Sequence, residues 1–276
     1  MHSSRQDIIF LNSFKFSTMT ESNSLKIFDL NDKVAVITGA SKGIGEAVAY
    51  LLASRGAKIV VSSRKPADVE AVAGEIRNKG GEAIGIACNT GNTEQCKNLI
   101  TETIQQFGGI DILVNNAATN PTYGPALECT AELFDKLMSV NVRGPFELAK
   151  LAYASMKQRG GGNVINISSV EGQTPHPGLG IYSVTKAALN MLTKVLAKEW
   201  GSDGIRVNAI APGVIRTKFS RALWDNPSVT EKFMKQISLN RIGTPEEIAY
   251  MVLFLVSGAS AYCTGSIFTA DGGLTI

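Results

Sequence analysis

The chain has 276 residues, 44% of them hydrophobic and 18% charged, which suits a globular protein with a large core. The Lys and Arg residues behind its net charge of +3 are scattered, so they predict no nucleic-acid-binding surface, and no apolar run is long enough to span a membrane. Four cysteines without CxxC spacing and two histidines argue against a zinc site, and we expect reduced, mostly buried thiols in a cytoplasmic protein.

The first 29 residues are rich in Ser and Asn and show no strong periodicity, so we predict a flexible N-terminal extension over 1–29. A translation start at Met19, a native tail and a targeting segment are all open alternatives for the first 18 residues. No Pro-, Gly- or Ser-rich linker divides the chain after residue 34. We therefore predict one domain over 30–276.

Short β-type runs alternate with helical patterns along this domain. The predicted strands are residues 34–38, 58–63, 82–88, 111–115, 163–168, 206–211 and 266–270. Helical segments such as 43–56 and 93–108 lie between them, and 248–262 is predicted to form a buried helix. The strands are apolar throughout, as expected when helices cover both faces. The pattern predicts the α/β class: a single-domain, Rossmann-type, doubly wound parallel sheet with helices on both faces.

The first predicted strand continues directly into "TGASKGIG", residues 38–45, and then into a helix. Glycines at 39, 43 and 45 allow a tight turn, close approach of a ligand to the backbone, and close packing of helix on strand. The free N–H groups of the following helix favour a pyrophosphate. We predict that this turn binds a dinucleotide through Gly39, Ser41, Lys42, Gly43, Ile44 and Gly45.

The second predicted strand ends with Ser63 followed by Arg64, where an NAD-binding protein would place an acidic residue for the ribose 2′-hydroxyl. Together with Lys42 in the glycine turn, Arg64 suits a 2′-phosphate. NADP(H) is therefore predicted over NAD(H). The alternative is that these cations are ordinary solvated charges.

The sequence "YSVTK" begins an amphipathic helix and places Tyr182 and Lys186 four residues apart, on one helix face. A nearby cation favours the phenolate, so we expect Lys186 to lower the pKa of Tyr182. A tyrosine with a lowered pKa can exchange protons near neutral pH. A surface tyrosine beside a solvated lysine is the alternative.

Together, "TGASKGIG", "NNAA", "NVRG", "NISS" and "YSVTK" resemble the motifs of the classical short-chain dehydrogenase/reductase family, over roughly residues 30–276. The resemblance implies a nicotinamide cofactor, a small-molecule substrate and a homotetramer, with no metal, nucleic acid or membrane partner. It implies that Tyr182 is the catalytic acid/base and that Lys186 lowers its pKa and holds the nicotinamide ribose. Ser169, thirteen residues before Tyr182, would bind the substrate carbonyl oxygen, and Asn141 would support a proton relay to Lys186.

The resemblance also extends to other segments of the cofactor site. "NNAA" resembles the family segment at the adenine ribose, although Asn116 is equally suited to bracing the sheet. "PGVIRT" resembles the turn that holds the nicotinamide carboxamide, and position 89 often holds an Asp at the adenine. The residues assigned on this basis are Asn89, Asn116, Ala117, Pro212, Gly213, Ile215 and Thr217.

The segment after "PGVIRT" is the expected determinant of substrate choice. Its apolar side chains predict either a mobile lid or an amphipathic helix packed on the domain. These side chains are Phe219, Leu223, Trp224, Phe233 and Met234. Their aromatic character favours bulky hydrophobic ketones or aldehydes.

Within the family, "NPTYG", "SSRK" and "FSRALW" are similar to the NADPH-dependent carbonyl reductases of the dehydrogenase/reductase member 4 type and their bacterial relatives. The terminal "LTI" is not the peroxisomal tripeptide of many animal members. The first alternative is a 3-oxoacyl-thioester reductase, against which Asp203 argues because a basic residue is usual in that neighbourhood. A sugar or polyol dehydrogenase and a non-catalytic NADP(H)-binding protein are the others.

Overall fold

We describe the protein from a computed structural model, in which residues 26–220, 231 and 234–276 are described. Seven parallel strands form one sheet in the order β3-β2-β1-β4-β5-β6-β7. The strands are β1 (Val34–Thr38), β2 (Lys58–Ser63), β3 (Ala83–Ala87), β4 (Ile112–Asn115), β5 (Gly162–Ile167), β6 (Ile205–Pro212) and β7 (Ile267–Ala270). This arrangement confirms the predicted doubly wound α/β fold.

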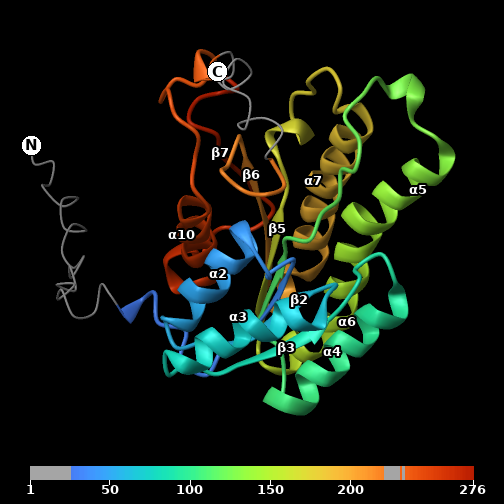
Figure 1. Ribbon diagram of the computed structural model, residues 1–276. Helices are drawn as coiled ribbons and strands as arrows, with labels where there is room; N and C mark the ends of the chain where they lie inside the picture. The colour runs from blue at the N-terminus through green and yellow to red at the C-terminus, as the bar shows by residue number, and fades with distance from the viewer. Residues whose placement is uncertain (1–25, 221–230, 232–233) are drawn as a thin grey trace, which may run out of the picture.

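Helices cover both faces of the sheet (Figure 1). They are α2 (Gly43–Ala53), α3 (Pro66–Asn78), α4 (Thr93–Phe107), α5 (Ala131–Met138), α6 (Gly144–Gln158), α7 (Gly180–Trp200) and α10 (Pro245–Val256). One buried cluster joins α2, α3 and α10 to the sheet, and a second cluster joins α4, α6 and α7 to the opposite face. The result is a three-layer molecule whose strands are buried on both sides.

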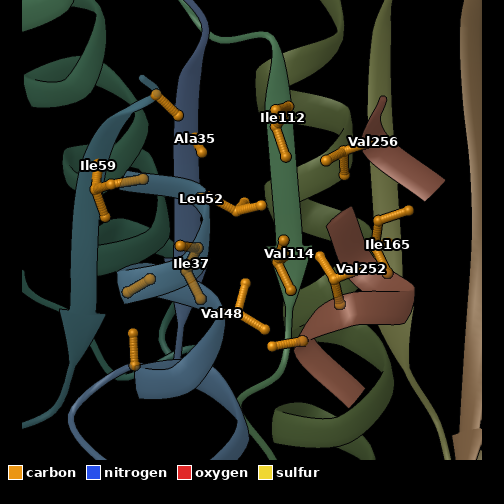
Figure 2. Packing of buried hydrophobic residues seen from close by; sticks show 14 of the residues in the cluster. Ala35, Ile37, Val48, Leu52, Ile59, Ile112, Val114, Ile165, Val252 and Val256 are labelled. Carbon is orange, nitrogen blue, oxygen red and sulfur yellow. The ribbon is translucent and has the colours of Figure 1, made fainter. Parts of the chain in front are cut away.

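Successive strand residues supply the two cores in turn. Ile112 and Val114 of β4 belong to the cluster under α2, α3 and α10, whereas Leu113 between them belongs to the other cluster. Figure 2 shows Val48 and Leu52 of α2 packed against these strand side chains. Because both faces need apolar residues, the strands read as continuous apolar runs.

The predicted boundaries differ from the structure mainly in the last buried helix. The apolar pattern predicts a helix over 248–262, but α10 begins at Pro245, behind a capping box formed by Thr244 and Glu247, and ends at Val256. The chain then passes through a short 3₁₀ turn, η5 (Gly258–Ser260). The prediction fails there because residues buried in a turn give the same apolar signal as a helix.

At the other end of the domain, Ile27 and Phe28 lie in the predicted extension but contact the folded part. Phe28 packs against the core, and the Ile27 carbonyl accepts a hydrogen bond of 3.2 Å from the Gly258 N–H. Residues 1–25 of the predicted extension lie outside the described residues. Cys88 and Cys96 are buried free thiols, and Cys129 and Cys263 are half-buried free thiols. None of the helices described is both long and apolar enough to cross a membrane.

Candidate active site

A cleft of about 980 Å³ opens at the carboxyl ends of the strands, where β1 and β4 are neighbours and the loops that follow them diverge. The predicted site residues that line it are Gly39, Ser41, Lys42, Gly43, Ile44, Ser63, Arg64, Asn89, Asn116, Ala117, Ser169, Tyr182, Lys186, Pro212, Gly213, Ile215 and Thr217. Gly45 and Asn141 are not in the lining. The fold thus brings together segments that are far apart in the sequence.

The glycine turn between β1 and α2 has a backbone that requires glycine. Gly39 and Gly43 have φ values of +64° and +63°, in the left-handed region. A Cβ at Gly45 would lie 2.5 Å from Asn116 Nδ2 and 2.7 Å from the Gly39 carbonyl oxygen, so this glycine lets α2 pack closely behind the turn. At the amino end of α2 the Lys42 side chain forms no capping hydrogen bond, and the Glu46 carboxylate accepts one from the Gly43 N–H. The positive end of the helix dipole lies there and favours an anion.

Thr38 and Asn116 hold the glycine turn to the end of β4. The Thr38 hydroxyl oxygen accepts hydrogen bonds of 3.0 Å from the backbone N–H groups of Asn116 and Ala117. The Asn116 amide donates to the carbonyl oxygens of Thr38 and Gly39, at 2.9 and 3.2 Å. Asn116 could either contact the adenine ribose or brace the sheet, and its side-chain hydrogen bonds join β4 to the end of β1 as a brace would. The residue nevertheless also lines the cleft.

Positive charge gathers where the cleft meets the end of β2. Lys42, Arg64 and Lys65 line this part, with Asp68 as the one carboxylate among them. In the described part of the chain, neither Lys42 nor Arg64 forms an ion pair with an acidic side chain. The Ser41 hydroxyl donates to the Ser63 hydroxyl at 3.0 Å and so joins the glycine turn to β2.

Asn89 and the segment after β6 line different parts of the cleft. The Asn89 side-chain oxygen accepts a hydrogen bond of 3.1 Å from the Gly91 N–H, so this oxygen is already used within its own loop. Beyond β6, Ile215 is buried and bridges to Gly243, while Thr217 faces the glycine turn. A Cβ at Gly43 would lie only 3.1 Å from Thr217 Cγ2, so these two segments approach each other across the cleft.

Ser169, Tyr182 and Lys186 meet on one side of the cleft. Tyr182 and Lys186 lie one turn apart in α7, and Ser169 caps the short turn η3 (Val170–Gly172), where its hydroxyl oxygen accepts a hydrogen bond of 3.2 Å from the Glu171 N–H. The Ser169 hydroxyl is also near enough to Tyr182 to favour the phenolate. The Lys186 ammonium lies 5.6 Å from the centre of the Tyr182 ring and donates to the Ile167 carbonyl oxygen at 2.8 Å. The neighbouring Ser168 hydroxyl instead donates to the Lys186 carbonyl oxygen at 3.3 Å. Ser169 is therefore the serine whose hydroxyl acts on Tyr182.

The sequence predicts a lowered Tyr182 pKa, but in this structure the Tyr182 pKa is raised. Burial raises it most, the Ser169 hydroxyl lowers it in part, and the Glu171 carboxylate raises it further. Burial also lowers the pKa of Lys186 to about 7. Sequence spacing puts the two groups side by side but does not report burial, which disfavours both the phenolate and the ammonium.

Asn141 lies in a short π-helical segment, η2 (Ser139–Arg143), and is buried. Its side-chain oxygen accepts from the Thr119 N–H at 2.8 Å, and its amide donates to the Thr119 carbonyl oxygen at 2.9 Å and the Thr185 hydroxyl at 3.1 Å. Asn141 thus ties α7 to the loop after β4. Its part in a proton relay stays a prediction.

Glu171 and His176 are among the cleft residues that the sequence did not suggest. Glu171 is buried against the amino end of α7. Glu171 follows Ser169 by only two residues, and this proximity to a predicted site residue is the sequence feature that could have identified it. The contact with His176 gave no such signal, because a carboxylate and an imidazole five residues apart in a loop have no preferred distance.

The predicted lid is described only in part. The Phe219 ring lies 6.2 Å from that of Tyr182, centre to centre, and lines the cleft, whereas Met234 does not. The remaining three apolar residues of the predicted lid, Leu223, Trp224 and Phe233, lie outside the described residues.

Comparison with known proteins identifies the family. A family model described as enoyl-(acyl carrier protein) reductase matches residues 39–275. Dehydrogenase/reductase SDR family member 4 of Bos taurus is 39% identical over 261 residues, which cover 95% of this chain and 94% of the bovine protein. The chain belongs to the short-chain dehydrogenase/reductase family. It is therefore an oxidoreductase that acts on CH–OH or C=O groups of small molecules, and the family binds nicotinamide cofactors.

Solved structures of similar short-chain dehydrogenases/reductases agree with this assignment. Gluconate 5-dehydrogenase from Burkholderia cenocepacia, in complex with NADP and tartrate, has 34% identity and a TM-score of 0.88, covering 91% of this chain and 98% of that one. A 7α-hydroxysteroid dehydrogenase, complexed with NADH and 7-oxo glycochenodeoxycholic acid, has 32% identity and a TM-score of 0.87, covering 90% and 96%. Related members of the family thus carry different nicotinamide cofactors and different substrates.

Proposed function

We propose that this protein is an NADP(H)-dependent carbonyl reductase, which interconverts hydrophobic ketones or aldehydes and their alcohols. The observation that carries the proposal is that Ser169 and Tyr182 line the same cleft as the glycine turn, with Lys186 beside the tyrosine ring. Two hydroxyl groups that converge on one point suit a carbonyl oxygen, on which negative charge develops during reduction.

The residues of the cleft fit a nicotinamide dinucleotide. The positive φ values of Gly39 and Gly43 and the amino end of α2 make a cradle for a pyrophosphate. The cleft volume of about 980 Å³ also suits a large ligand. When bound, the cofactor supplies the hydride for reduction.

The chain's own residues would then handle the carbonyl oxygen and its proton. Ser169 would hold the oxygen by a hydrogen bond, and Tyr182 would deliver a proton to it as the alcohol forms. Lys186 would stabilise the resulting phenolate, because its ammonium lies beside the ring. Asn141, which ties α7 to the loop after β4, would keep this helix in place.

The preference for NADP(H) over NAD(H) is supported by charge. Three cations and one carboxylate line the end of the cleft near β2, so a 2′-phosphate would find a net positive environment there. The similar gluconate 5-dehydrogenase was solved with NADP. The similar hydroxysteroid dehydrogenase was solved with NADH, so family membership alone does not favour either cofactor.

A second candidate is reduction of the 3-oxo group of 3-oxoacyl thioesters, and the matching family model is described by an acyl-carrier-protein substrate. Against it, Asp203 lies where thioester reductases often carry a basic residue. Asp203 forms an ion pair of 2.8 Å with Lys157, which removes the free positive charge that an acidic carrier protein would meet. Carbonyl reduction is therefore preferred. The homotetramer and the cytoplasmic location stay predictions.

The deciding experiment measures oxidation of NADPH, with NADH in parallel, against aromatic ketones, α-dicarbonyls, acetoacetyl thioesters and keto-sugars. Turnover of the aromatic ketones or dicarbonyls with a preference for NADPH is the expected result. Turnover of thioesters alone would instead establish the second candidate. A preference for NADH would mean that Arg64 and Lys42 do not select the cofactor. Binding of NADPH without turnover of any compound would contradict carbonyl reduction.

A further inference from the structure

Glu171 and His176 form a pair at the edge of the cleft that the proposed chemistry does not use. The Glu171 carboxylate accepts hydrogen bonds from the Ser183 hydroxyl at 2.8 Å and the His176 backbone N–H at 3.0 Å, both on Oε2. Its other oxygen lies 2.6 Å from His176 Nδ1. The carboxylate side chain is only 9% exposed, so the loop between η3 and α7 folds around it.

This contact determines how the imidazole ring is presented to the cleft. An ionised carboxylate can only accept, so Nδ1 must carry the proton that it shares with Glu171. In the neutral ring, the proton on Nδ1 leaves Nε2 as a hydrogen-bond acceptor. The side chain is 30% exposed and lines the cleft, and Nε2 has no hydrogen-bond partner in the described part of the chain.

We infer that His176, positioned by Glu171, accepts a hydrogen bond from a hydroxyl group of the substrate. Given the proposed carbonyl reduction, the preferred substrates are then ketones that carry a hydroxyl group near the reacting carbonyl. The reacting group and the recognised group are held by adjoining parts of the chain, because Glu171 lies two residues after Ser169 and Ser183 directly follows Tyr182. The Glu171 contacts therefore tie the recognition site to the two hydroxyls proposed to hold the carbonyl.

The loop that carries His176 is held in place from a second side. The Tyr123 hydroxyl donates to the Pro177 carbonyl oxygen at 2.8 Å, and the Gly124 N–H donates to the Gly178 carbonyl oxygen at 3.0 Å. A Cβ at Gly178 would lie 2.5 Å from the Tyr123 ring, so the two loops are in close contact. These contacts allow a control variant that loosens the loop without altering the imidazole.

The experiment compares 1-phenylpropan-1-one with its 2-hydroxy and 3-hydroxy derivatives, using NADPH. The readout is the ratio of kcat/KM for the hydroxyketone to that for the parent ketone, in wild type and in variants. His176→Asn keeps a donor near the position of Nδ1 and removes Nε2, whereas His176→Gln places an amide near the position of Nε2. A neutral hydrogen bond is worth about 1 kcal/mol, so the ratio should fall roughly fivefold in His176→Asn for at least one derivative.

Partial recovery of the ratio in His176→Gln, together with a wild-type ratio in Tyr123→Phe, is the expected pattern. An unchanged ratio in His176→Asn would overturn the assignment while leaving carbonyl reduction intact. An equal fall in Tyr123→Phe would also overturn it, because loop position rather than Nε2 would then be responsible. If the wild type reduces none of the three ketones with NADPH, the proposed function fails, and the role of His176 fails with it.

Discussion

At the residue scale, the Tyr182 hydroxyl is the group whose removal separates chemistry from binding. Tyr182→Phe keeps the ring that packs near Phe219 and Lys186 but removes the proton donor. We expect kcat to fall by a factor on the order of 1,000, the range for loss of a general acid, with little change in NADPH affinity. Steady-state kinetics and a fluorescence titration with NADPH measure the two effects, and wild-type turnover in the variant would refute the role of Tyr182.

Lys186 makes stability depend on pH because it is buried in the folded chain. Its pKa falls from 10.5 to about 7, so between these values the unfolded chain binds a proton that the folded chain does not. The free energy of unfolding of the wild type should therefore rise, relative to Lys186→Met, by about 1.4 kcal/mol per pH unit over this range. Below pH 7 both states are charged, and the difference should be constant.

Urea unfolding of wild type and Lys186→Met at pH 6 and pH 9 tests this expectation. Lys194→Met is a matched control, since Lys194 is an exposed lysine of the same helix. A difference between wild type and Lys186→Met that does not change with pH would show that the Lys186 pKa is not lowered.

Arg64 is the residue on which the proposed cofactor preference depends most directly. Arg64→Leu removes a cation from the cleft end near β2, and we expect the KM for NADPH to rise roughly tenfold while the KM for NADH stays within twofold. Arg55→Leu, the same change at an exposed arginine outside the cleft lining, should alter neither value. Equal losses with both cofactors would contradict a contact to the 2′-phosphate.

At the element scale, the position of Ser169 depends on how closely η3 packs against α7. A Cβ at Gly172 would lie 2.7 Å from the Lys186 carbonyl carbon and 2.8 Å from Asn190 Nδ2. Gly172→Ala should therefore move η3 away from α7 and separate Ser169 from Tyr182. We expect kcat to fall on the order of 100-fold, with NADPH affinity retained and stability reduced by about 1–3 kcal/mol.

Gly201→Ala is the control for this change. Gly201 caps the carboxyl end of α7, and a Cβ there would meet nothing within 4 Å. The kcat of this control should match the wild type. If Gly172→Ala kept full activity, then close packing of η3 on α7 would not be what sets the distance between the two hydroxyls.

At the scale of the whole molecule, a buried ion pair that stabilises the fold lies at the amino ends of the strands, whereas the cleft lies at their carboxyl ends. Asp111 lies at the amino ends of the strands, away from the cleft, and is buried. Its carboxylate accepts hydrogen bonds from the Val34 N–H at 2.9 Å and from the Arg159 guanidinium at 2.9 and 3.0 Å. It thus joins the starts of β1 and β4 to the carboxyl end of α6.

Asp111→Ala leaves the Val34 N–H and the Arg159 guanidinium without this partner and should lower the free energy of unfolding by roughly 3 kcal/mol. Glu82→Ala, which breaks a surface ion pair with Lys58, should cost less than about 1 kcal/mol. Both folded variants should retain kcat/KM within twofold. A large loss of activity in folded Asp111→Ala would show that the two edges are coupled.

The sequence by itself determined the architecture, and most of the site residues that it predicts line the cleft. Continuous apolar runs specify strands covered on both faces, and the glycine turn specifies where the first strand meets its helix. These signals are local, because a turn or a strand depends on residues that are neighbours in the chain. The cleft could be anticipated for the same reason, since parallel strands bring their carboxyl ends to one edge.

Only the tertiary structure decided what depends on contacts between distant segments. The burial that raises the pKa of Tyr182 and the bracing contacts of Asn116 both follow from packing of separate elements. The Glu171–His176 pair belongs to the same class, because a flexible loop allows many separations at one sequence spacing. Sequence therefore predicts which groups are present at the site, whereas packing sets their protonation and their partners.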